Sequence, residues 1–281
     1  MEPALRLQIV REIEAALAGG PVVAVATVVS AGEPARVTPG EKLLVHGEGP
    51  YSGTLGDLAA DRTIAEAARA MFTANPRLAM QTLYLGGDGV AEPRPSRAED
   101  GDAEVMVQLF SAPARLVIVG GGHVGLATAT IGEIAGFGVT VIDDRPEFAN
   151  RERFPMAEQV IAADAEDALR DIEFDANTYV VLVSRGHRQD EEALRHTVNC
   201  GAAYVGMIGS KRRTSTILRH LEEEGVAAEA LARVSTPIGL DIAAETPEEI
   251  AISILAEIIM LRRGGSGGRM RATNSGAPPL A

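Results

Sequence analysis

The chain is poor in cysteine and in aromatic residues. Cys200 is the single cysteine, tryptophan is absent, and aromatic residues make up 4% of 281 positions. Cys200 has no second thiol to pair with, which excludes an intramolecular disulfide, and no group of cysteines and histidines has the spacing of a zinc site. The sequence therefore fits a reducing compartment, and we expect a cytoplasmic protein without a structural metal.

Basic residues are also in short supply. The chain has 26 Lys and Arg against 39 Asp and Glu, which gives a net charge of -13. Such a charge repels phosphodiester backbones and anionic lipid surfaces, and so argues against nucleic acid and membranes as partners. A small phosphorylated ligand remains compatible, because backbone N–H groups and local Arg or Lys can hold an anion inside an acidic protein.

No hydrophobic run is long enough to cross a bilayer, which takes about 20 apolar residues. Residues 1–11 mix charged with apolar positions, unlike a signal peptide. Residues 250–261 are apolar but are interrupted by Glu257, so we expect a buried helix there. Thr246 and Glu249 precede this run at the spacing of a capping box, which predicts where that helix begins.

Residues 1–112 are expected to form a small α+β domain. An apolar stripe with helical spacing at residues 5–17 ends at two glycines, and strand-like runs then alternate with turns rich in glycine and proline. Residues 86–102 carry glycine, proline and charge without an apolar period, which predicts an exposed loop. The expected strands are 22–29, 42–46, 51–55, 78–85 and 104–110, with a helix at 64–72.

The pattern changes at Pro113, where apolar runs begin to alternate with helical ones. This alternation is typical of a parallel sheet with crossover helices, so residues 113–263 are expected to form an α/β domain, a Rossmann-like doubly wound sheet. Residues 264–281 lack apolar spacing and are expected to be a disordered tail. The expected strands are 116–119, 139–142, 159–162, 178–184 and 203–208.

A glycine-rich turn follows the first strand of this domain. Gly120, Gly122 and Gly125 have the spacing at which the first glycine permits a tight turn, the second admits a pyrophosphate, and the third lets the helix pack close to the strand. His123 and Val124 open that helix. The turn is therefore predicted to bind the phosphate of a dinucleotide or a similar cofactor, the alternative being a Rossmann fold used only as a scaffold.

An acidic residue stands at the end of the second strand. Asp143 lies about 20 residues beyond the glycines, where it can accept a hydrogen bond from a ribose hydroxyl. It favours a free 2′-hydroxyl, as in NAD, and it is followed by Asp144 and by Arg145, which could instead attract the 2′-phosphate of NADP. The sequence here leaves the choice between NAD and NADP open.

Two further strands end in polar residues, and in such a sheet the carboxyl ends of the strands form the ligand-binding rim. These strand ends supply the remaining candidate cofactor-binding residues, which are Ser184, Arg185, Gly186, His187, Gly209, Ser210 and Lys211. Two of them also have an ordinary structural interpretation: Lys211 could be a solvated residue at the start of a helix, and His187 could cap a helix.

Five blocks of the sequence together resemble the XdhC/CoxI family. They read GGGHVG, VIDDRP, SRGHRQD, YVGMIGSKRR and PIGLDIAAETPEEIAISILAEI, and they fall in the family's order within residues 116–261. The resemblance implies an accessory protein of a molybdenum hydroxylase such as xanthine dehydrogenase. It implies binding of the molybdenum cofactor, molybdopterin, support of its sulfuration, delivery to the apoenzyme client, and often a homodimer.

The sequence departs from the family at one turn of the N-terminal domain. The family continues that turn as Gly-Gly-Gly-Cys-x-Glu, whereas this chain reads Gly-Asp-Leu-Ala-Ala-Asp at residues 56–61. A thiol is the natural soft ligand for molybdenum or carrier for sulfur. Cys200 lies in the other domain and is interpreted as a small packed residue.

Three functions therefore compete. The first is a maturation factor that holds molybdopterin for its client. The second is an NAD(P)-dependent oxidoreductase derived from the same family, in which His187 or Lys211 acts as the catalytic acid or base. The third is a nucleotide-sensing scaffold without chemistry. The resemblance favours the first, and the departure at residues 56–61 favours the second.

Overall fold

A computed structural model describes residues 2–32, 37–74, 79–86, 91–93, 102–184 and 187–270, and only the backbone of residues 73, 92, 187 and 188. The chain divides into two compact units, Met1–Ala112 and Pro113–Ala281. Two candidate site residues, Arg185 and Gly186, lie outside the described residues, as does the expected tail beyond Met270.

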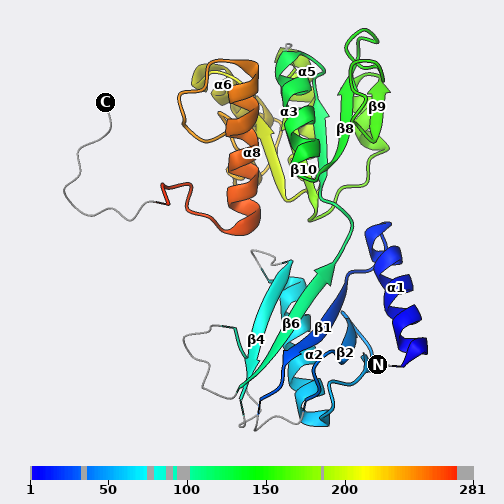
Figure 1. The fold of residues 1–281 in the computed structure, drawn as a ribbon. Coiled ribbons are helices and arrows are strands. Elements are labelled where there is room, and N and C mark those ends of the chain that lie inside the picture. Colours follow the sequence, from blue (N-terminus) through cyan, green and yellow to red (C-terminus); the bar gives the residue numbers. More distant parts are fainter. Residues whose placement is uncertain are drawn as a thin grey trace, which may run out of the picture. The chain divides into compact units, whose positions relative to one another are not determined.

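The first unit is a six-stranded antiparallel sheet with two helices (Figure 1). The strand order is β3-β2-β1-β6-β4-β5. The elements are α1 (Pro3–Leu17), β1 (Val23–Ser30), β2 (Lys42–His46), β3 (Ser52–Gly53), α2 (Leu58–Thr73), β4 (Met80–Leu85), β5 (Ala91–Glu92) and β6 (Ala103–Phe110).

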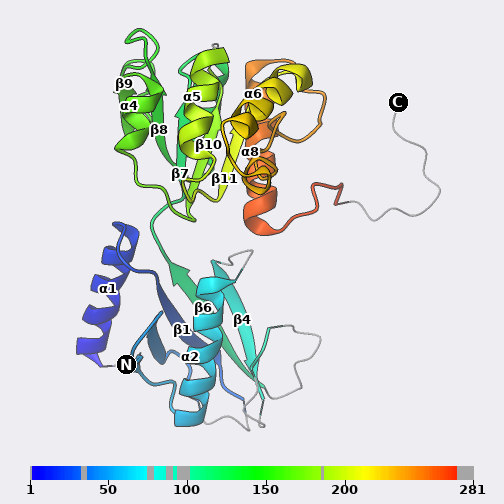
Figure 2. The same cartoon turned by 180° about the vertical axis from the view of Figure 1, so that it is seen from behind.

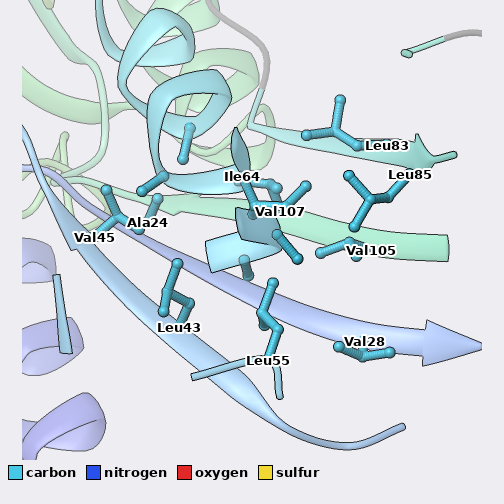
Figure 3. Packing of buried hydrophobic residues seen from close by; sticks show 14 of the residues in the cluster. Ala24, Val28, Leu43, Val45, Leu55, Ile64, Leu83, Leu85, Val105 and Val107 are labelled. Atoms are coloured by element: carbon cyan, nitrogen blue, oxygen red, sulfur yellow. The ribbon is translucent and has the colours of Figure 1, made fainter. Parts of the chain in front are cut away.

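Strict alternation along the strands gives the first sheet two different faces. Ala24, Ala26 and Val28 of β1 belong to a buried cluster with Ile64 and other residues of α2. The intervening Val23 and Val25 pack instead with Ile9 and Ala16 of α1. Figure 3 shows the cluster on the α2 side, with Leu43, Leu83 and Val107 of three further strands in it.

Two expectations for this unit need correction. Helix α2 begins at Leu58 and not at residue 64, because the Asp57 carboxylate accepts hydrogen bonds from the N–H groups of Ala59 (2.8 Å) and Ala60 (3.0 Å) and so caps an earlier start. Within the expected loop 86–102, Ala91–Glu92 forms strand β5, which pairs with the end of β4. This short strand carries too few residues for an apolar period to be visible.

The second unit is a parallel sheet in the order β11-β10-β7-β8-β9, which is a Rossmann arrangement. Its strands are β7 (Arg115–Val119), β8 (Gly138–Asp143), β9 (Gln159–Ala162), β10 (Thr178–Leu182) and β11 (Tyr204–Met207). Its helices are α3 (His123–Ile134), α4 (Ala165–Arg170), α5 (His187–Thr197), α6 (Lys211–Glu223), α7 (Ala228–Leu231) and α8 (Pro247–Arg263).

Helices cover both faces of this sheet. α3 and α8 pack on one face, visible in Figure 1, through Ala129, Ile254 and Ile258. α4, α5 and α6 pack on the other, visible in Figure 2, through Leu169, Leu194 and Ile217. The predicted α/β class with a doubly wound parallel sheet and a smaller N-terminal α+β unit is confirmed.

The apolar run at the end of the unit forms helix α8. The capping box at Thr246 and Glu249 is present, as predicted. Glu257, which interrupts the run, accepts hydrogen bonds from the Tyr204 hydroxyl and from the Gly239 N–H (2.9 Å). Burial raises the pKa of Tyr204, and the bond to Glu257 raises it further. In the described part of the chain, no helix is long and apolar enough to cross a membrane.

We expect Tyr204→Phe to lower the free energy of unfolding by about 1–2 kcal/mol, because a half-buried carboxylate loses a hydrogen-bond donor. Hydrogen exchange of amides in β11 and α8 measures the change. Tyr84→Phe is the matched control, since the Tyr84 hydroxyl has no hydrogen-bond partner among the described residues and its removal should leave exchange unchanged. Equal effects of the two substitutions would contradict the role of the Glu257 contact.

Candidate functional site

The predicted glycine turn lies where the strand order reverses. It joins β7 to α3, and β7 has β8 on one side and β10 on the other, so the turn stands at the switch point of the sheet. Ligands of open α/β sheets bind outside the carboxyl ends of the strands at this point. Asp143, Ser184 and Gly209 lie at the ends of β8, β10 and β11, and therefore come to the same edge.

The three glycines of the turn differ in whether the fold requires glycine at that position. Gly120 has φ +117°, and a Cβ there would lie 2.7 Å from the Ser184 nitrogen. A Cβ on Gly125 would lie 1.9 Å from the Gly120 carbonyl oxygen, so the close approach of α3 to β7 requires that glycine. Gly122 has φ -67°, and a Cβ there would meet no atom within 4 Å. The fold does not require glycine at position 122, which faces open space.

The N-terminus of α3 faces the same open space. Gly122 is the N-cap residue and provides no side-chain hydrogen bond, so the first-turn N–H groups around His123 and Val124 have no side-chain cap. No acidic residue stands in this first turn. A helix N-terminus of this kind carries a partial positive charge and favours an anion.

Gly121, which lies between Gly120 and Gly122, is held by hydrogen bonds to the last residue of β8 and to the segment after β8. Its N–H donates to the Asp143 carboxylate at 2.8 Å, and its carbonyl accepts from the Arg153 side chain at 3.0 Å. A Cβ on Gly121 would lie 2.2 Å from the Phe148 carbonyl oxygen. The turn is therefore fixed by contacts that the spacing of the glycines did not reveal.

Asp143 lies at the expected place, but its carboxylate already has partners within the protein. It is 6% exposed, and besides Gly121 it accepts from the Arg145 side chain through Nε (2.9 Å) and Nη2 (3.0 Å). The Arg145 guanidinium also stacks on the Phe148 ring, 3.9 Å from its centre. Burial alone would raise the pKa of Asp143, but the hydrogen bonds from Arg145 and Gly121 outweigh it and hold that pKa below its usual value.

The lowered pKa of Asp143 predicts a pH dependence of stability. An ordinary aspartate titrates near pH ~3.9, so the stabilisation by Asp143 is complete above that pH and is lost as the pH falls through the lower folded-state pKa. We expect the wild type to be more stable than Asp143→Asn at pH 7, with the difference shrinking below about pH 4. Urea unfolding of both proteins at pH 7 and pH 3 measures it. A difference that stays constant would contradict the assignment.

A buried ion pair supports the rim between β10 and β11. Asp190 of α5 is fully buried and accepts from the Ser184 hydroxyl and from the Arg213 guanidinium of α6. Arg213 is not among the predicted site residues, and the sequence alone indicates for Asp190 only a first-turn acid. Their pairing spans 23 residues and depends on how α5 and α6 pack, so no local signal announces it.

A shallow hollow lies beside Asp143 and Ser184. It measures about 10 Å³, which is room for about one water molecule. Its lining includes Gly120, Asp143, Asp144, Ala165, Ser184 and Gln189. A larger hollow of about 340 Å³ opens at the opposite edge of the sheet, near Asn199 and Arg233, away from the predicted site residues.

The remaining predicted residues lie at the same rim but have fewer defined side-chain contacts. Ser210 caps α6 by accepting from the Arg213 N–H at 3.4 Å, and Lys211 opens that helix with an exposed side chain. His187 is the first residue of α5, and only its backbone is described. The structure thus brings the backbones of these positions to one edge of the sheet.

The single cysteine lies away from the glycine turn. Cys200 precedes β11 at the amino edge of the sheet, away from the glycine turn, and burial raises the pKa of its thiol. Among the described residues, no group of three or more His, Cys, Asp or Glu could hold a metal ion.

Two aspartates stabilise the turn at residues 56–61, where the sequence departs from the family motif. Asp57 caps α2, and the fully buried Asp61 accepts from the Leu55 N–H at 2.6 Å. Ala59, at the position of the family's cysteine, is exposed.

Comparison with known proteins places both units in one family. A model described as the XdhC Rossmann domain matches residues 116–258, and a model described as the XdhC and CoxI family matches residues 16–82. A Bacillus halodurans protein described as a xanthine dehydrogenase shares the fold, with a TM-score of 0.53 and 18% identity over 91% of this chain and 96% of that chain.

Two curated proteins are similar in sequence. The uncharacterized protein YqeB of Escherichia coli K12 is 33% identical over 82% of this chain and 42% of its own length. A Bacillus subtilis protein described as a probable xanthine dehydrogenase subunit is 30% identical over 58% of this chain and 48% of its own length. The chain thus spans less than half the length of these relatives. Because the Rossmann-domain model matches half of the chain and the second model matches the other unit, the chain belongs to the XdhC and CoxI family.

Proposed function

We propose that this chain is an accessory protein of a molybdenum hydroxylase and that its Rossmann unit holds a phosphate-bearing cofactor at the Gly120–Gly125 turn. The observation that carries the proposal is the open space at Gly122 in front of an α3 N-terminus without a side-chain cap. The name of the Bacillus subtilis relative, a probable xanthine dehydrogenase subunit, supports the class of client.

Molybdopterin fits this turn by its phosphate. Backbone N–H groups at the start of α3 would hold that phosphate, and Lys211 adds positive charge on the same edge of the sheet. Ser184, Gly209, Ser210 and the backbone of His187 border the same edge. When bound, the cofactor supplies two sulfur atoms that carry the metal, and this chain contributes orientation and charge.

The chain does not fit the role of a thiolate ligand to molybdenum. Cys200 lies at the opposite edge of the sheet, and Ala59 stands where the family has its cysteine. We therefore assign the organic, phosphate-bearing end of the cofactor to this chain and leave the metal's ligands to other molecules.

Calorimetric titration with molybdopterin tests the cofactor assignment, with inorganic phosphate as the minimal probe. We expect saturable binding that weakens as salt rises, since a phosphate is held by charge. A parallel sample contains NADH or NADPH with imines, carbonyls and unsaturated substrates. Consumption of the nicotinamide, abolished in His187→Ala, would replace this proposal with the oxidoreductase alternative.

Reconstitution tests the client. Xanthine dehydrogenase prepared without its molybdenum cofactor should gain activity faster when the chain is added with molybdopterin than with molybdopterin alone. Equal rates of activation with and without the chain would contradict delivery.

We further propose that the protein is a cytoplasmic homodimer. Sedimentation velocity measures its oligomeric state directly.

A further inference from the structure

The rim next to the glycine turn carries a feature that the Rossmann pattern alone does not predict. In dinucleotide-binding folds, the acid at the end of the second strand accepts a hydrogen bond from the ribose. Here that acid, Asp143, is already bound by the Gly121 N–H at 2.8 Å, and by the Arg145 side chain at 2.9 and 3.0 Å. A ribose hydroxyl must displace one of these donors to reach it.

Arg145 is fixed in this blocking position. Two of its nitrogens form a fork on the carboxylate, and its guanidinium lies 3.9 Å from the centre of the Phe148 ring. Its backbone N–H also donates to Asp143, at 3.1 Å. Four hydrogen bonds thus converge on the two carboxylate oxygens, and a ribose would lose more in displacing them than it gains.

The charges around Arg145 also disfavour binding of the 2′-phosphate of NADP. Asp144 stands beside Arg145, with its carboxylate 3.8 Å from the guanidinium, and Glu147 adds a third negative charge close by. The positive charge of Arg145 is therefore already offset.

We infer that Arg145 is a specificity-determining residue: by occupying Asp143 it removes the ribose acceptor, so that the turn binds a phosphate monoester and gains no affinity from the ribose of NAD or NADP. This inference rests on the proposed phosphate site at Gly120–Gly125 and narrows its ligand class. A pterin phosphate meets the requirement, because it needs the α3 N-terminus but no ribose acceptor at the end of β8.

Two small probes isolate the contribution of the nucleoside. Methyl phosphate reports the turn alone, and 5′-AMP adds a ribose and a base to the same phosphate. In the wild type we expect the two dissociation constants to agree within about threefold. In Arg145→Leu, Asp143 becomes free to accept from the ribose, and 5′-AMP should bind about tenfold tighter than methyl phosphate, the value of about one hydrogen bond to a charged group.

Methyl phosphate also serves as the folding control, because its binding should be the same in the wild type and in Arg145→Leu. Arg170→Leu removes a charge from the exposed surface of α4 and should leave the ratio of the two constants at its wild-type value. Arg145→Lys retains the charge without the fork and should give an intermediate ratio.

The outcomes separate this inference from the proposed function. If neither probe nor molybdopterin binds the wild type, the phosphate site itself is wrong. If methyl phosphate binds but 5′-AMP or NAD⁺ binds tenfold tighter, the site exists and the inference is overturned. A ratio that stays unchanged in Arg145→Leu overturns the role of Arg145.

Discussion

Gly122→Asp is expected to weaken phosphate binding at the glycine turn by at least about 100-fold while the Rossmann unit stays folded. The new carboxylate would occupy the space that the ligand needs and would place a negative charge at the N-terminus of α3. The backbone at Gly122 is in a region that any residue adopts, with no atom within 4 Å of a Cβ, so the substitution causes no clash. Aspartate is also a better N-cap than glycine, by about 0.3–1 kcal/mol.

Calorimetry with methyl phosphate and thermal unfolding of the full chain measure the two effects together. Gly125→Ala is the contrasting variant, because its Cβ would lie 1.9 Å from the Gly120 carbonyl and should destabilise the unit. Binding retained in Gly122→Asp would remove the α3 N-terminus from the site. A large loss of stability in that variant would show instead that position 122 serves the fold.

Asp190→Ala is expected to destabilise the Rossmann unit by about 3 kcal/mol, the cost of removing one partner from a buried ion pair. Asp190 is fully buried, whereas its partner Arg213 keeps 21% of its side chain exposed, which places the effect at the lower end of the usual range. The Ser184 hydroxyl loses its acceptor in the same change. Hydrogen exchange in β10 and α6 should accelerate together.

Asp167→Ala provides the matched control for Asp190. It removes an aspartate of the same size from an exposed pair with Arg170, where Asp167 is 74% exposed, and should change the free energy of unfolding by less than about 0.5 kcal/mol. Asp190→Asn retains a hydrogen-bond acceptor for Ser184 and should fall between the two. Exchange rates in Asp190→Ala equal to those of the wild type would contradict the structural role of the pair.

The sequence predicted the features of the fold that depend on local pattern. A continuous apolar strand, three spaced glycines and an acid after the next strand sufficed to predict β7, α3 and β8, since each follows from burial and backbone conformation. The apolar period predicts a start for α2 that is six residues too late, because the first turn of the helix is fixed by the capping aspartate, Asp57, and not by apolar residues. That signal was present in the sequence.

The chemistry of the candidate site was less predictable. Asp143 was expected to bind a ribose, and its position is as expected, but its partners depend on how the segment after β8 folds back over the turn. Arg145 is two residues away, where an ion pair can be guessed, whereas Arg153 is 32 residues beyond Gly121 and its contact needs the tertiary structure. The Asp190–Arg213 pair is of the same kind.

The two hydrogen bonds that hold Gly121 have a consequence for the thermodynamics of recognition. Because its N–H and its carbonyl both have partners within the protein, we expect the turn to keep its conformation when a ligand binds. The conformational entropy of ordering it is lost during folding, and no such loss accompanies association. Ligands should therefore bind to a preorganised turn, with association rates set by diffusion and charge and with amide exchange in residues 120–125 nearly the same in the free and bound protein.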